Sequence, residues 1–213
     1  MANRPVFEVM EQSPFVRKRN IDFKFFSGFS IQQKQRCIRS LHESYTVETG
    51  NDKILEISSK SENPLGVALS AFNLSKVDDK GLHLSVESLF QGSKVFELGG
   101  PYKDLYFKSS LEAHKDNRIR ESGIITGFQF YNQYFPNEPK TYFFDWLYIN
   151  ILHQNTELAD EIMEYNAFTD IEFNPQRQLN CQAEAAAIYV GLRKIGKLEE
   201  VLDKDKFKKI LYG

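Results

Sequence analysis

Residues 85–94 read SVESLFQGSK, a stretch that combines helical spacing of apolar side chains with three polar side chains on a single line. At about 100° per residue, Glu87, Gln91 and Lys94 project within roughly 60° of one another. Leu89 and other apolar side chains project on the opposite side, so the predicted helix is apolar almost everywhere else. The polar line therefore either faces water or lines a pocket.

Glu87 and Lys94 carry chemistry that such a pocket would use. Glu87 falls near the predicted start of the helix, where the helix dipole and unpaired backbone N–H groups favour an ionised carboxylate. Such an anion suits stabilisation of a ribosyl cation, or activation of a water that attacks it. Lys94 would bind phosphate or, with a neutral amine, attack a sugar aldehyde. The alternative is structural, because glutamate and lysine at these positions are most often solvated.

Composition predicts one compact globular domain. The chain has 213 residues, of which 41% are hydrophobic, with 18 Phe and 10 Tyr, and this is enough to bury a substantial core. Its 27 basic and 29 acidic residues leave a net charge of −2, which excludes a global attraction to nucleic acid or an anionic membrane. Any DNA contact must be local. Short basic runs at 17–19 and 206–209 would touch phosphates in one interpretation, but such runs are usually solvated.

The cysteine and histidine content indicates neither a disulfide framework nor a metal site. Cys37 and Cys181 are too few and too far apart, and the four histidines form no pair with metal-ligand spacing. We therefore expect no metal and no cofactor. The N-terminal sequence lacks a signal-peptide pattern, and no run approaches ~18 consecutive apolar residues. We expect a cytoplasmic protein with no membrane partner.

Local patterns predict an α+β fold that is mainly helical, with short strands early in the chain. Alternation of apolar residues predicts strands at 21–26 and 53–58. Ser30 would cap a helix of about 15 residues over 31–45. The Asn-Pro and Gly of residues 61–66 predict a turn. An extended apolar run over 67–74 and a hairpin or loop over 77–85 would follow.

The second half of the chain is predicted to be largely helical. Ser85, Thr156 and Asn180 are the expected N-caps. The charged stretch 112–121 is expected to be a solvated surface. Helices are expected from Ser85 to a point before Gly99, and over 144–153, 156–165 and 181–195.

Three further residues have ordinary structural explanations. Asp170 lies next to a threonine between helices, where aspartate is most often a turn or cap residue. Trp146, the only tryptophan, is more often a core residue than a stacking platform. Asn180 looks like an N-cap. None of them alone indicates an activity.

Taken in order along the chain, these residues resemble the NADAR superfamily (YbiA-like proteins), whose pattern is S-N-F, a loop, and V-E-x-x-F-Q-x-x-K. The matching portion covers roughly residues 69–195. Ser70 and Phe72 match the first element, and the second is matched by Glu87, Phe90, Gln91 and Lys94. Asp145-Trp146 is similar to the family's D-W pair, and Asp170 stands at the aspartate of D-x-x-W-G. Asn180 opens a segment similar to N-x-L-G-x-x-L-M-x-x-R.

The sequence departs from this pattern in three places, where Ala71 replaces the S-N-F asparagine, Phe173-Asn174 replace W-G, and Cys181-Gln182-Ala183 replace the L-G step.

The segments KFFSGFS, QKQRCIRSLH, EISSKS and FTDIEFNP resemble one branch, the NADAR antitoxins paired with DarT-type toxins that ADP-ribosylate guanine in DNA. This resemblance extends over nearly the whole chain. It implies a YbiA-like single domain over 1–213 with a small sheet and a helical bundle, in which family-specific strands and a helix (1–68) precede the NADAR core (69–195).

The resemblance also implies residue roles in cleavage of an N-glycosidic bond at ribose C1. Glu87 would be the main catalytic carboxylate, and Asp170 a second acid/base or a ribose-positioning group. Lys94 would orient the sugar or form a transient imine with its opened aldehyde. The remaining substrate-binding positions would be Ser70, Phe72, Asn73, Gln91, Trp146 and Asn180.

Three functions are compatible with these features. The leading hypothesis is a DNA ADP-ribosyl-guanine glycohydrolase that acts on modified single-stranded DNA, releases ADP-ribose, and serves as the antitoxin to a DarT-type toxin. The second is an N-glycosidase of riboflavin-pathway ribosyl phosphates, as the superfamily also implies. The third is a non-catalytic protein that binds ADP-ribose or the cognate toxin.

Overall fold

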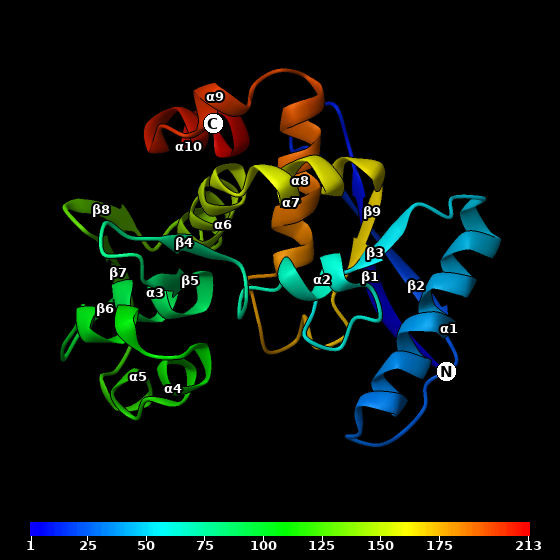
Figure 1. The fold of residues 1–213 in the computed structure, drawn as a ribbon, viewed down its shortest axis with the longest axis horizontal. Coiled ribbons are helices and arrows are strands. Elements are labelled where there is room, and N and C mark those ends of the chain that lie inside the picture. Colours follow the sequence, from blue (N-terminus) through cyan, green and yellow to red (C-terminus); the bar gives the residue numbers. More distant parts are fainter.

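The computed structural model describes residues 1–213 and has an α+β fold, as predicted. Its strands form three small sheets (Figure 1). The strands are β1 (Ala2–Val9), β2 (Val16–Phe23), β3 (Ile54–Glu56), β4 (Ser75–Val77), β5 (His83–Ser85), β6 (Lys94–Phe96), β7 (Ile125–Phe130), β8 (Gln133–Pro136) and β9 (Ala167–Thr169). The α-helices are α1 (Ile31–Thr49), α2 (Pro64–Ala68), α3 (Val86–Ser93), α4 (Ser110–Lys115), α5 (Arg118–Glu121), α6 (Tyr142–Gln154), α7 (Thr156–Glu161), α8 (Gln182–Lys194), α9 (Leu198–Val201) and α10 (Lys204–Tyr212), with 3-10 turns at Lys103–Phe107 and Ile162–Glu164. None of these helices has both the length and the apolar content needed to cross a bilayer.

The largest sheet has the strand order β2-β1-β9-β3 and lies between two helices. β1 is antiparallel to both of its neighbours, whereas β3 and β9 run parallel. Alternate side chains of β1 face opposite sides: Val6 joins the cluster under α1, and Phe7 joins the large core that includes α8. Because β9 comes from late in the chain, the segment that follows it is placed beside the end of β3.

The other half of the molecule is built on α6, with α3 and the β6-β7-β8 sheet on the side of Figure 1 away from α1. Aromatic rings fill the space between these elements. Phe90 of α3 stacks on Phe128 and Phe143, with ring centroids 5.5 and 6.0 Å apart, and meets Phe144 edge-on at 5.3 Å. These rings are buried and dominate the packing energy there, so they fix the position of α3.

The predicted caps at Ser30 and Ser85 are confirmed. Ser30 accepts a hydrogen bond from the Gln33 N–H, and Ser85 accepts one from the Ser88 N–H. The helix that begins after Ser85 is shorter than predicted. It ends at Ser93, because Lys94 pairs with Phe128 of β7 and so begins β6.

Residues 67–74 were expected to be extended, and this is wrong: residues 67 and 68 end α2, and the backbone then turns, with the Asn73 and Leu74 N–H groups donating to the Ser70 carbonyl oxygen. Asn63 caps α2 by accepting the Leu65 N–H, and Pro64 suits the first helical position. α2 lies so close to β3 that a Cβ on Gly66 would be 1.9 Å from the Glu56 carbonyl oxygen. Glycine therefore sets how near α2 and its preceding loop come to the end of β3.

Several other expectations are corrected by the structure. Strands are not confined to the early chain, since β6 to β9 lie beyond residue 93. Cys181, not Asn180, occupies the N-cap position of α8, and Asn155, not Thr156, that of α7. The basic run 17–19 lies in β2, where two of its arginines bind the buried carboxylate of Glu8.

Candidate active site

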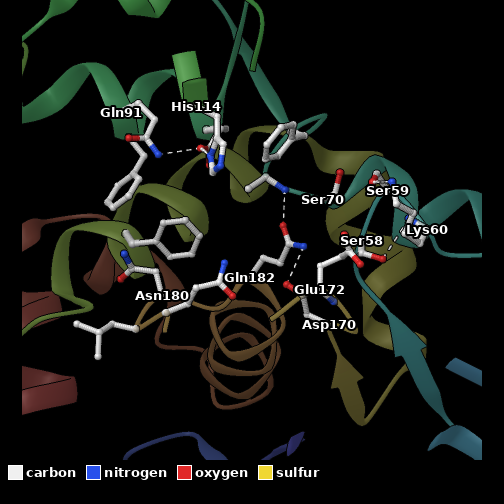
Figure 2. Close-up of a pocket in the computed structure, with 17 residues that line it drawn as sticks. Ser58, Ser59, Lys60, Ser70, Gln91, His114, Asp170, Glu172, Asn180 and Gln182 are labelled. Atoms are coloured by element: carbon white, nitrogen blue, oxygen red, sulfur yellow. Dashed lines mark hydrogen bonds and ion pairs between the residues drawn. The ribbon is translucent and has the colours of Figure 1, made fainter. Parts of the chain in front are cut away.

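A cavity of about 430 Å³ lies between α3, the loop from β3 to α2, and the segment that joins β9 to α8. Its volume is within the range of small-molecule sites. Figure 2 shows side chains from these separate elements converging on it, with Gln91 and His114 at one end and Ser59 and Lys60 at the other. Among the predicted site residues, those in the lining are Ser70, Phe72, Glu87, Gln91, Asp170 and Asn180.

Glu87 and Gln91 of the polar line face this cavity, and all three residues of the line are buried from bulk water. Glu87 is 7% exposed, Gln91 6% and Lys94 9%. Gln91 Nε2 donates to Glu87 Oε1 at 2.8 Å, and Lys94 Nζ donates to Gln91 Oε1 at 2.7 Å. Lys94 is not itself in the lining. The three side chains thus form a buried hydrogen-bonded series that ends at the Glu87 carboxylate.

His114 completes this end of the cavity. Its Nδ1 lies 2.7 Å from Glu87 Oε1, and the hydrogen bond to this carboxylate raises the pKa of His114. A capping box between Ser109 and Glu112 starts α4 and so places His114 in its last turn. His114 was not predicted as a site residue, because the charged stretch 112–121 was expected to be a solvated surface. The S-x-x-E spacing was the available signal of a helix there.

Asp170 forms part of the opposite wall, directly after β9. Its Oδ1 accepts hydrogen bonds from the N–H groups of Glu172 and Phe173 at 2.9 and 3.2 Å, as expected of a turn aspartate. Its Oδ2 accepts one from Gln182 Nε2 at 3.0 Å (Figure 2). Burial and the nearby Glu56 carboxylate raise the pKa of Asp170 to about 8. The residue is therefore both a turn residue and a cavity residue.

Glu56 lies beneath this wall and was not anticipated from the sequence. Its carboxylate is 2% exposed and accepts hydrogen bonds from Thr169 Oγ1 at 2.6 Å and from the Ile171 N–H at 2.8 Å. Burial raises the pKa of Glu56. Two carboxyl groups are thus held at the adjoining ends of β3 and β9, and each disfavours ionisation of the other.

The backbone at Ala71 joins the two walls. Its carbonyl oxygen accepts the Glu87 N–H at 2.9 Å, and its N–H donates to Gln182 Oε1 at 2.6 Å. Gln182 also donates to Asp170 and to the Ile57 carbonyl oxygen. The sequence analysis noted Gln182 only as a departure from the family pattern, because nothing local indicates a contact 111 residues away.

Trp146 and Asn73 lie outside the cavity. Trp146 Nε1 donates to the Leu202 carbonyl oxygen at 2.9 Å, and its ring packs against Phe130 and Phe135. The expectation that Trp146 lines the pocket is therefore wrong, because its ring is used by the core. Asn73 donates to the Val67 carbonyl oxygen and lines a neighbouring hollow.

Two features of the lining are suited to a polar ligand. The Oδ1 atom of Asn180 is buried without a hydrogen-bond partner, although such atoms are nearly always paired in folded proteins. At the far end, Lys60 Nζ donates to Ser59 Oγ, which gives this end a positive charge beside hydroxyl groups. No three His, Cys, Asp or Glu side chains are grouped so as to hold a metal ion.

The fold and the site define an α+β protein with a cavity of about 430 Å³ that has a carboxyl group on each wall. The family model of the DarT1-associated NADAR antitoxin matches residues 2–213, and the chain belongs to this family. The resemblance drawn from the motifs is thereby confirmed over nearly the whole chain, and a cognate toxin is implied as a partner. A comparison with curated proteins finds no match.

The titration of His114 reports directly on its bond to Glu87. Because the folded-state pKa lies above the ordinary value of 6.5, the linked stabilisation is complete below about pH 6.5 and is lost as the pH rises through the raised pKa. Glu87→Gln removes the anionic partner and should lower the pKa of His114, as measured by NMR titration of the ring. His153, on α6, is the internal control. An unchanged His114 titration in the variant would contradict the pairing.

Proposed function

We propose that the protein is an ADP-ribosyl glycohydrolase that removes ADP-ribose from a modified guanine base in DNA and so reverses the action of its cognate toxin. The observation that carries this proposal is the buried Glu87 carboxylate, which opens on a cavity of ligand size with Asp170 on the facing wall. Most glycoside hydrolases place two carboxyl groups on either side of the scissile bond.

Glu87 is proposed to stabilise the positive charge that develops at ribose C1 as the glycosidic bond breaks. Gln91 and His114 both hydrogen-bond to Glu87 Oε1, so the carboxylate is oriented before the substrate arrives. A charge that is already in place needs no reorganisation during the reaction. The same carboxylate would orient the water whose oxygen forms the new bond to C1 and would accept the proton that this water loses.

Asp170 is proposed to donate the proton that the departing base takes up. With a pKa of about 8, its carboxyl group is largely protonated at pH 7, as a general acid must be. Different surroundings thus assign different tasks to the two carboxyl groups, since Asp170 has the buried acid Glu56 beside it, whereas Glu87 is bonded to Gln91 and His114.

The rest of the lining supports an ADP-ribose ligand in one orientation. Lys60 and the neighbouring serine hydroxyls would hold the pyrophosphate. Phe72, with 38% of its surface exposed and its ring centroid 5.7 Å from that of His114, would offer an aromatic face to a base. The unpaired Oδ1 of Asn180 would accept a hydrogen bond from a ribose hydroxyl or an amino group.

Glu87→Gln should abolish catalysis without unfolding the protein. Removing a fixed charge that acts mainly in the transition state lowers the rate by roughly 100-fold or more. The assay is release of ADP-ribose from a modified single-stranded oligonucleotide, with thermal unfolding as the check on folding. Glu121→Gln, an exposed carboxylate outside the cavity, is the matched control and should be unaffected.

The same variant separates the competing functions. A Glu87→Gln protein that still protects cells from the toxin would favour neutralisation by binding over catalysis. Wild-type protein that ignores the modified oligonucleotide but cleaves a pyrimidine ribosyl phosphate would favour the metabolic N-glycosidase. The carboxyl group on each wall favours hydrolysis over simple binding.

The pH dependence tests the role of Asp170. If its protonated form is the acid, kcat/KM should fall as the pH rises through about 8. Asp170→Asn keeps the Oδ1 acceptor for the two backbone N–H groups but has no proton to lose, so it should be slow and lack this alkaline limb. An identical limb in the variant would assign the titration to another group, such as Lys94, whose pKa burial lowers to about 8.

Lys94 could either form an imine with the substrate or position Gln91, and borohydride trapping distinguishes these two roles. Because burial lowers the pKa of Lys94 to about 8, part of its amine is neutral at pH 7, and this fraction could condense with the C1 aldehyde to an imine with loss of water. The partly neutral amine predicts a borohydride-reduced adduct with ADP-ribose on Lys94, found by peptide mass mapping. Lys60 is the comparison residue in the cavity lining. No adduct on Lys94 would leave it the role of positioning Gln91.

A further inference from the structure

A second hollow of about 570 Å³ adjoins the cavity. The two share Ser59 and Phe72 in their linings, so these side chains stand between them. The second hollow continues over β4 and β5 to the residues that lead into α4. A ligand attached to the contents of the cavity would therefore pass Phe72 and enter this hollow.

The chemistry of the hollow differs from that of the cavity. The cavity includes the acidic residues Glu87, Asp170 and Glu172, whereas the lining of the hollow contains no acidic residue. Its other members are mainly serines, together with His83 and Lys108. Imidazole and ammonium donors are groups that bind phosphodiesters. The hydroxyl groups of Ser85, Ser109 and Ser110 already donate hydrogen bonds within the protein.

The two basic side chains of the hollow are available to a ligand. Lys108 is exposed and enters none of the ion pairs of the molecule, which in this region join Arg118 to aspartates. The nearby carboxylate of Glu112 is occupied by the capping box with Ser109. His83 uses Nδ1 toward Ser75 at 3.2 Å, which leaves its Nε2 for another partner.

Phe72 is suited to the junction between the two sites. It is a large apolar side chain with 38% of its surface exposed, and Leu111, 54% exposed, is the other hydrophobic member of the hollow. Nucleic-acid bases stack on such exposed aromatic rings whatever the base sequence, and the phosphates of the same strand bind lysine side chains. One exposed aromatic ring in the same hollow as Lys108 and His83 therefore suits a single nucleic-acid strand.

We propose that this hollow binds the nucleotides flanking the modified base, so that the strand crosses Phe72 while the ADP-ribosyl group occupies the cavity. This inference rests on the proposed function and adds the path of the substrate strand. The net charge of −2 provides no global attraction to DNA, which makes a local site of this kind necessary for a DNA substrate.

The test compares Lys108→Glu with Lys206→Glu, which makes the same charge change at an exposed position on α10, far along the chain from the hollow. Two substrates are used: an ADP-ribosylated single-stranded oligonucleotide and ADP-ribosylated guanosine, which has no flanking phosphates. The ratio of kcat/KM on the oligonucleotide to that on guanosine should fall roughly tenfold in Lys108→Glu and stay unchanged in Lys206→Glu. An unchanged ratio in Lys108→Glu would overturn the proposal.

A binding measurement keeps this test independent of the proposed activity. Fluorescence anisotropy with an unmodified single-stranded oligonucleotide should show roughly tenfold weaker binding for Lys108→Glu, and a smaller dependence on salt. Wild-type protein that binds the oligonucleotide but cleaves neither substrate would remove the proposed function and leave the strand site. Loss of toxin co-purification in Lys108→Glu with oligonucleotide binding intact would make the hollow a toxin interface and overturn the proposal.

Discussion

The peptide group of Ala71 holds the two walls of the cavity in register, and the rest of the site depends on this connection. Its carbonyl oxygen accepts the N–H of Glu87, and its N–H donates to Gln182, which in turn bonds Asp170. Main-chain atoms therefore contribute to the separation of the two carboxyl groups. Because these bonds use the backbone of residue 71, alanine can make them as well as the asparagine of the superfamily pattern.

The two walls then give their carboxyl groups different surroundings. Glu87 receives hydrogen bonds from an amide and an imidazole, and its own N–H is already used by Ala71. Asp170 lies above the buried Glu56, so the two acids oppose each other's ionisation. This electrostatic asymmetry arises from packing at the end of the N-terminal sheet, far in sequence from α3. Residues that follow β3 and residues of α3 thus both line one cavity.

The parts of the site that the sequence predicts are the local ones. Spacing by four residues along a capped helix was sufficient to place Glu87 and Gln91 on one line. It could not place His114, whose bond spans 27 residues, or Gln182, whose bond to Ala71 spans 111. Lys94 shows the opposite error, because pairing with β7 ends a helix that the local pattern would continue. Trp146 was wrongly predicted to line the pocket, because the order of motifs along the chain does not show which aromatic side chains pack in the core.

The aromatic backing of Phe90 has a consequence for which ligands the cavity can accept. Phe90 and Phe144 line the cavity on one side, and behind Phe90 lie the stacked rings of Phe128 and Phe143. Close-packed interiors have low compressibility, so this wall cannot move to accommodate a larger ligand. Gln178 and Leu179, also in the lining, are exposed side chains. Directed evolution toward broader ligand acceptance would therefore succeed by mutating Gln178 and Leu179 and fail on α3.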